Sequence, residues 1–221
     1  QKKDGIWHFL KNAKFKTNKS LKKYDLLHKE NSGDPNDGSY EILASFARGN
    51  KTLDIACGQG LIEKLAPETV GLDFSINALK KAKEKGAKYL VLGDAQSLPF
   101  KDNSFDVAIS AGSLEHLEKP QKAIIEMARV SKIQILTVHR KLPFPLDYLE
   151  IFTISILRIK HQPIEKPLSL KRLEKILKKA NLHIVFKGEW TLPVNRGKIV
   201  KFLPEFKSLS SCWFVVSIKS R

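Results

Sequence analysis

The residues best suited to chemistry are glycines and acidic residues that stand at the ends of short apolar runs. The first such segment reads Asp54-Ile55-Ala56-Cys57-Gly58-Gln59-Gly60. Its two glycines let the backbone turn sharply and approach a ligand closely, because they carry no side chain. Asp54 stands inside the apolar run, where an unpaired carboxylate is costly. We therefore expect Asp54 to accept hydrogen bonds from loop amides or to face a cationic ligand.

Two further carboxylates end the next two apolar runs. Asp73 closes the run at residues 69–73, and an acidic residue there can accept hydrogen bonds from both hydroxyls of a ribose. The alternative role for Asp73 is to cap the helix that begins after Ser75. Asp94 ends the third run and precedes Ala95. A carboxylate and the following backbone amide can pair with an adenine edge, although the same pair also suits a turn.

Side chains for acid–base chemistry follow a fourth apolar run, which ends at Ser110. His116 is the first candidate for a general base, because an imidazole titrates near neutrality. Glu115 is the second candidate. A structural contact is an equal alternative role for His116.

These residues need a scaffold in which strands and helices alternate. Apolar runs predict strands at residues 52–57, 69–73, 88–94, 105–110, 133–138, 182–190 and 212–219, and helical patterns occupy residues 40–48, 61–66, 76–86, 120–130 and 169–180. In the first helix the pattern places Ile42, Leu43 and Phe46 on the apolar face. Near-continuous apolar strands are typical of a sheet covered by helices on both faces. The alternation therefore predicts a doubly wound α/β sheet, which binds ligands beyond the carboxyl ends of its strands.

Taken in order, the motifs resemble those of the class I S-adenosylmethionine-dependent methyltransferases, in particular the methyltransferase type 11 subgroup. The segments that carry the likeness are LDIACGQG, VGLDFS, GDAQSLPFKDNSFDVAIS and SLEHL, within residues 51–138. The resemblance implies a Rossmann-like fold: a mostly parallel seven-stranded sheet with an antiparallel last strand. It also implies an N-terminal helical cap at residues 1–50, a cofactor-binding domain at 51–221 and a variable substrate-cap region at about 140–168.

The resemblance further implies that the cofactor is S-adenosyl-L-methionine. The methionine part would lie over Gly58 and Gly60, Asp73 would hold the ribose, and Asp94 and Ala95 would hold the adenine. His116 would lie near the sulfonium end, and Tyr24 resembles part of an N-terminal motif that folds over the cofactor. The other expected cofactor-binding residues are Asp54, Ala56, Cys57, Phe74, Ser75, Ser110 and Leu114. Ala56 departs from the family, which usually has a glycine or a larger residue there.

The net charge of +16 bears on the methyl acceptor. Such a basic chain is drawn to polyanions, although a lysine-rich solvated surface is the simpler interpretation. We expect a small-molecule acceptor first and RNA second, because Ser-Ala-Gly-Ser at residues 110–113 replaces the Asn/Asp-Pro-Pro-aromatic motif of amino-methylating nucleic-acid enzymes. A basic nucleic-acid-binding protein that keeps the fold without catalysis is a further alternative. A nicotinamide oxidoreductase is disfavoured, because Glu63 stands where the dinucleotide fingerprint needs a third glycine.

Cysteine usage and hydropathy indicate the compartment. Cys57 and Cys212 show no metal-ligand spacing, so we expect neither a metal site nor a disulfide framework. No apolar run is long enough to span a bilayer. These features favour a reducing, cytoplasmic environment.

Overall fold

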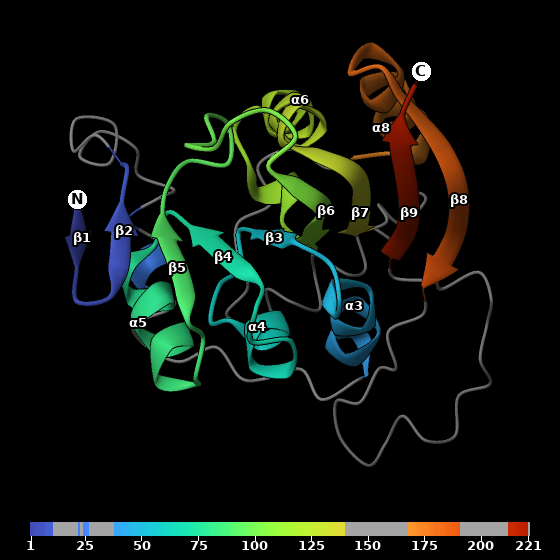
Figure 1. Ribbon diagram of the computed structural model, residues 1–221. Coiled ribbons are helices and arrows are strands. Elements are labelled where there is room, and N and C mark those ends of the chain that lie inside the picture. Colours follow the sequence, from blue (N-terminus) through green and yellow to red (C-terminus); the bar gives the residue numbers. More distant parts are fainter. Residues whose placement is uncertain (11–21, 23, 27–37, 140–167, 191–211, 221) are drawn as a thin grey trace, which may run out of the picture.

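Nine strands of the described chain form one continuous sheet. The computed structural model describes residues 1–10, 22, 24–26, 38–139, 168–190 and 212–220. In these ranges the strand order is β1-β2-β5-β4-β3-β6-β7-β9-β8 (Figure 1). The predicted substrate-cap region falls almost entirely on residues 140–167, which lie outside the described ranges.

The centre of the sheet is parallel and coincides with the predicted apolar runs. Its strands are β3 (Thr52–Ile55), β4 (Val70–Asp73), β5 (Tyr89–Leu92), β6 (Phe105–Ala111) and β7 (Ser131–His139). The last strand, β9 (Cys212–Lys219), runs antiparallel between β7 and β8 (Leu182–Trp190). Strand order reverses at β3, which pairs with β4 on one side and β6 on the other. The predicted doubly wound, mostly parallel sheet with an antiparallel last strand is therefore confirmed.

The sheet has more strands than the seven predicted, because two short strands lie at the N-terminus, within the residues predicted as a helical cap. There, β1 (Lys2–Lys3) and β2 (Ile6–His8) extend the sheet beyond β5. β2 runs parallel to β5, and β1 runs antiparallel to β2. Ile6, which is 1% exposed, fixes this arrangement because it packs with Leu79 and Leu90. A strand of three residues has no periodicity for sequence analysis to detect. The domain boundary at residue 50 stays a prediction.

Helices cover both faces of the sheet, as Figure 1 shows. On one face lie α3 (Ser39–Ala47), α4 (Leu61–Leu65) and α5 (Ile76–Glu84), and on the other α6 (Pro120–Val130) and α8 (Leu170–Lys179). Local sequence sets their starts: Ser75 caps α5, Ser169 caps α8, and proline opens α6, where its missing N–H costs no hydrogen bond. In the described ranges no helix is both long and apolar enough to cross a bilayer.

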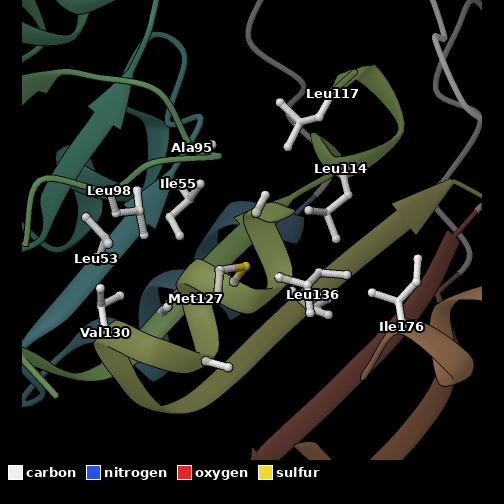
Figure 2. Close-up of a cluster of buried hydrophobic side chains, with 14 of the residues drawn as sticks. Leu53, Ile55, Ala95, Leu98, Leu114, Leu117, Met127, Val130, Leu136 and Ile176 are labelled. Carbon is white, nitrogen blue, oxygen red and sulfur yellow. The ribbon is translucent and has the colours of Figure 1, made fainter. Parts of the chain in front are cut away.

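The main hydrophobic core lies between the sheet and helices α6 and α8. Figure 2 shows Leu53 and Ile55 of β3 facing Met127 of α6 and Leu136 of β7 in this cluster. A smaller cluster under α3 corrects the predicted face of that helix. Leu43, Ala44 and Ala47 are buried, whereas Ile42 and Phe46 are 49% and 38% exposed. Small alanines let α3 approach the sheet closely, which turns the larger side chains outward.

Candidate functional site

The loop after β3 adopts a left-handed backbone at three of its five residues. Ala56, Gly58 and Gly60 have φ values of 59°, 56° and 71°. A Cβ atom on Gly60 would lie 2.7 Å from the Cβ atom of Ala82, so the loop packs directly against α5. The glycines thus allow the sharp turn and close packing of this loop, which lies at the carboxyl edge of β3, beside the reversal of strand order. This is where an open α/β sheet binds its ligand.

Asp73 ties this glycine loop to the start of α5. Its Oδ2 accepts the Gly58 N–H at 2.9 Å, and its Oδ1 accepts the Ser75 N–H at 2.8 Å. The side chain is buried, and burial raises the pKa of Asp73 to about 6 although the backbone N–H donors act in the opposite direction. Asp73 thus contacts the residue that caps α5, whereas the cap itself is Ser75. Each carboxylate oxygen keeps a further lone pair, so the ribose role stays a prediction.

An N-terminal segment reaches the same place through residues 24 and 25. Ser75 caps α5 by accepting the Ala78 N–H at 3.0 Å, and its hydroxyl donates to Asp25. The Asn77 side-chain amide donates to Asp25 Oδ2 at 2.8 Å. The ring of Tyr24 packs on Phe74 with 4.8 Å between centroids. The structure therefore brings the predicted residues Tyr24, Phe74 and Ser75 together with Asp25, which follows Tyr24 in the expected N-terminal motif. Sequence reasoning missed Asn77.

The segment after β5 is a tight turn. Asp94 Oδ1 accepts the backbone N–H of Gln96 at 2.8 Å, and its carbonyl oxygen accepts the Ser97 N–H at 2.9 Å. Ala95 is buried against the main core. The turn alternative is thus observed, and the adenine role of Asp94 and Ala95 stays a prediction.

The segment after β6 holds the candidate acid–base residues. The hydroxyls of Ser110 and Ser113 lie 2.6 Å apart, and a 3-10 turn η1 (Leu114–His116) follows. Glu115 is buried and His116 is half-buried in this turn. The Leu114 side chain is enclosed in the main core, as Figure 2 shows, so a ligand could meet only the backbone of this residue. The roles predicted for Ser110, Glu115 and His116 remain predictions.

Two carboxyl groups beneath the glycine loop lack hydrogen-bond partners in the described structure. They are Asp54 at Oδ1 and Glu63 at both oxygens. Burial, and then the neighbouring Asp73, raises the pKa of Asp54 to about 8. Burial, followed by Asp54, also raises the pKa of Glu63. Sequence reasoning used Glu63 only to argue against a dinucleotide site. The sequence feature that could have revealed the buried Glu63 is the glycine at position 71, in the strand against which the helix of Glu63 packs.

Cys57 completes the loop. Its backbone N–H donates to the Leu72 carbonyl at 3.1 Å, and its thiol is buried. Burial, followed by the charge of Glu63, raises the thiol pKa. A protonated thiol is a poor nucleophile and metal ligand, which suits a packing role. In the part of the chain that the structure describes, no group of three His, Cys, Asp or Glu residues is arranged to hold a metal.

The site fits the cofactor implied by the motifs. Gly58 leaves part of its backbone uncovered, Asp73 offers hydrogen-bond acceptors at the end of β4, and Asp54 Oδ1, buried beneath the loop, lacks a hydrogen-bond partner in the described structure. A cationic methionine end suits the loop and Asp54 in chemistry, and a ribose suits Asp73.

Comparison with known proteins indicates a methyltransferase, as the sequence motifs do. The family described as a methyltransferase domain matches residues 53–134. Demethylmenaquinone methyltransferase of Renibacterium salmoninarum is 38% identical over 89 residues, which cover 38% of this chain and 38% of that relative. The chain therefore matches about two fifths of the length of this relative.

Solved structures agree on the fold. A methyltransferase of Thermotoga maritima described as a possible histamine N-methyltransferase superimposes with a TM-score of 0.64 at 19% identity, covering 94% of this chain and 97% of that one. Magnesium protoporphyrin IX methyltransferase of Synechocystis gives 0.60 at 15% identity, covering 89% and 93%. The chain therefore has the Rossmann-like methyltransferase fold, and the resemblance found in the sequence is confirmed over residues 53–134, which match the methyltransferase domain.

Proposed function

We propose that the protein transfers a methyl group from S-adenosyl-L-methionine to a small-molecule acceptor. The observation that carries this proposal is the joint arrangement at the carboxyl edge: Asp73 fastens the glycine loop within a segment, residues 53–134, that matches the methyltransferase domain. A nicotinamide site is disfavoured, because Glu63 fills the space at Gly71 where the dinucleotide fingerprint would need close helix–strand packing.

The residues of this chain have two tasks in such a reaction. When bound, the cofactor supplies an activated methyl group on a sulfonium. The glycine loop, Asp73 and the Asp94 turn would bind and orient it. The Tyr24–Phe74 contact would help to exclude water. His116 Nδ1 or Nε2 would accept a proton from an acceptor that carries one, with Glu115 as the second candidate. His116 is half-buried, so part of the residue reaches the surface.

Two observations bear on the acceptor. A curated relative is named for demethylmenaquinone, a small molecule, and this name supports the first choice. RNA is the second candidate, favoured by the exposed face of α8. Leu173, Ile176 and Leu177 of that helix are buried, whereas the exposed face carries Lys171, Arg172, Lys175, Lys178 and Lys179.

Binding and transfer can be tested separately. Calorimetry with S-adenosylmethionine, S-adenosylhomocysteine and NAD should show one site per chain for the first two and none for NAD. Mass spectrometry of a cell extract incubated with the protein and methyl-labelled cofactor should then reveal the labelled product. Binding of NAD without binding of either sulfur compound would overturn the proposal. A labelled nucleoside after RNA digestion would place RNA ahead of small molecules.

A further inference from the structure

The carboxyl groups of Asp54 and Glu63 lie side by side beneath the glycine loop. Asp54 on β3 pairs in register with Gly71 on β4, so the two positions face the same side of the sheet. Glu63 reaches from α4 into the space that Gly71 leaves open. A Cβ atom on Gly71 would lie 2.6 Å from Glu63 Oε1 and 2.9 Å from Cys57 Sγ. The missing side chain at position 71 is thus the room that the Glu63 carboxyl occupies.

Among the described residues, no positively charged group lies beside this pair to neutralise two ionised carboxylates. Asp54 is 2% exposed, Glu63 is fully buried, and three of their four carboxyl oxygens have no hydrogen-bond partner. The nearby ionisable groups on the packed elements are themselves acidic: Cys57 in the loop, Asp73 on β4, and Asp25 beside Ser75.

Two basic residues near the neighbouring helices donate to other groups. Arg48, which follows α3, donates to the Leu65 carbonyl, and Lys85, which follows α5, donates to Gln59 Oε1. Lys64 of α4 is exposed to solvent and Lys81 of α5 is half-buried. Two ionised carboxylates would cost several kcal/mol in such a place, so the pair holds at least one proton in the free protein.

We propose that the Asp54–Glu63 pair exchanges this proton for the positive charge of the cofactor. When the methionine end, with its ammonium and sulfonium groups, binds on the outer side of the glycine loop, the carboxyl O–H bond breaks and the proton passes to solvent. The carboxylate left behind is the counter-charge of the ligand. This inference rests on the proposed function, and it makes Glu63 a specificity-determining residue that favours charged ligands over neutral ones.

The raised pKa values of both carboxyl groups support this exchange and set its pH range. With a pKa of about 8, Asp54 is mostly protonated at pH 7, and a nearby positive charge lowers that pKa. The release of protons on cofactor binding should therefore be large near pH 7. It should decrease above pH 8, where Asp54 is already ionised in the free protein. Asp73 also titrates, with a pKa of about 6. Its expected ligand is the ribose, so a ribose-containing ligand without positive charge can correct for it.

The test counts protons by calorimetry at pH 7 in two buffers that differ in ionisation enthalpy. The ligands are S-adenosylmethionine, S-adenosylhomocysteine, which lacks the sulfonium, and 5′-methylthioadenosine, which lacks the ammonium and the sulfonium. We expect S-adenosylmethionine to release at least about half a proton more than 5′-methylthioadenosine, with S-adenosylhomocysteine between them. Glu63→Gln and Asp54→Asn should each reduce the excess, whereas Asp106→Asn, which removes an exposed carboxylate at the opposite edge, should preserve it.

Equal proton counts for the three ligands on the wild-type protein would overturn the exchange. So would an excess that survives in both Glu63→Gln and Asp54→Asn, because the proton would then come from another group. If either variant fails to fold, the wild-type comparison alone still decides. Binding of none of the three ligands would overturn the proposed function itself, which distinguishes that failure from the failure of the exchange.

Discussion

Ala56 lies in the glycine loop and has a left-handed backbone conformation, which is unfavourable for a residue with a side chain. Its φ is 59°, a conformation that costs an L-residue about 1–2 kcal/mol relative to glycine. Glycine loses about 0.4–1 kcal/mol through the greater freedom of the unfolded chain. We therefore predict that Ala56→Gly raises the free energy of unfolding by up to about 1 kcal/mol in urea denaturation. Ala44→Gly in the middle of α3 is the control and should lower it by at least about 0.5–1 kcal/mol. Equal losses in both variants would contradict the strain at position 56.

Asp73 has a double task, because its carboxylate holds the loop and would also hold the ribose. Asp73→Ala should weaken S-adenosylmethionine binding by about 2–4 kcal/mol, since charged hydrogen bonds contribute about 1.5–3 kcal/mol each and do not add. Asp73→Asn keeps one acceptor and should lose less. Titration calorimetry gives both affinities, and circular dichroism checks the fold. Unchanged affinity in Asp73→Ala, together with lower thermal stability, would leave only the contacts to Gly58 and Ser75 as its role.

At the scale of elements, sequence reasoning succeeded where one periodicity or one cap decides the outcome. Residues 120–130, 182–190 and 212–219 form elements with the predicted bounds, because long amphipathic or apolar runs leave one way to bury their side chains. It failed where tertiary packing decides. The buried face of α3 depends on how closely Ala44 and Ala47 approach the sheet, and β2 depends on one side chain, Ile6. The Asp54–Glu63 pair was missed because it depends on the missing side chain at Gly71 of the neighbouring strand, which leaves room for the Glu63 carboxyl.

The N-terminal strand β2 offers a test with two adjacent residues on opposite faces. Ile6 is 1% exposed and Trp7 is 45% exposed. Ile6→Ala should therefore lower the free energy of unfolding by about 2–4 kcal/mol, as for a buried isoleucine. Trp7→Ala should cost about 1 kcal/mol or less, because its ring keeps much of its contact with water. Urea denaturation of both variants measures the difference. Similar small losses would mean that β2 contributes little to the sheet.

At the scale of the whole molecule, the buried acids should make the free protein less stable as the pH rises. Folding raises the pKa of Asp54 to about 8 and that of Asp73 to about 6, compared with about 3.9 for an ordinary aspartate in the unfolded chain. The folded state therefore binds more protons than the unfolded state in this window. The stability that these groups contribute is present below about pH 4 and is lost as the pH rises, through about 6 for Asp73 and about 8 for Asp54.

Asp54→Asn should weaken this trend, because an amide keeps the shape of the carboxyl group without its charge. We predict that the difference in unfolding free energy between Asp54→Asn and the wild type moves in favour of the variant from pH 5 to pH 8.5, by at most about 1.4 kcal/mol per pH unit. Urea denaturation at pH 5, 7 and 8.5 without ligand measures it, and Asp106→Asn is the control. Asp106 is exposed and its pKa is lowered by Lys132, so its removal should not favour the variant at high pH. A difference for Asp54→Asn that is constant with pH would mean that Asp54 stays ionised in the folded protein.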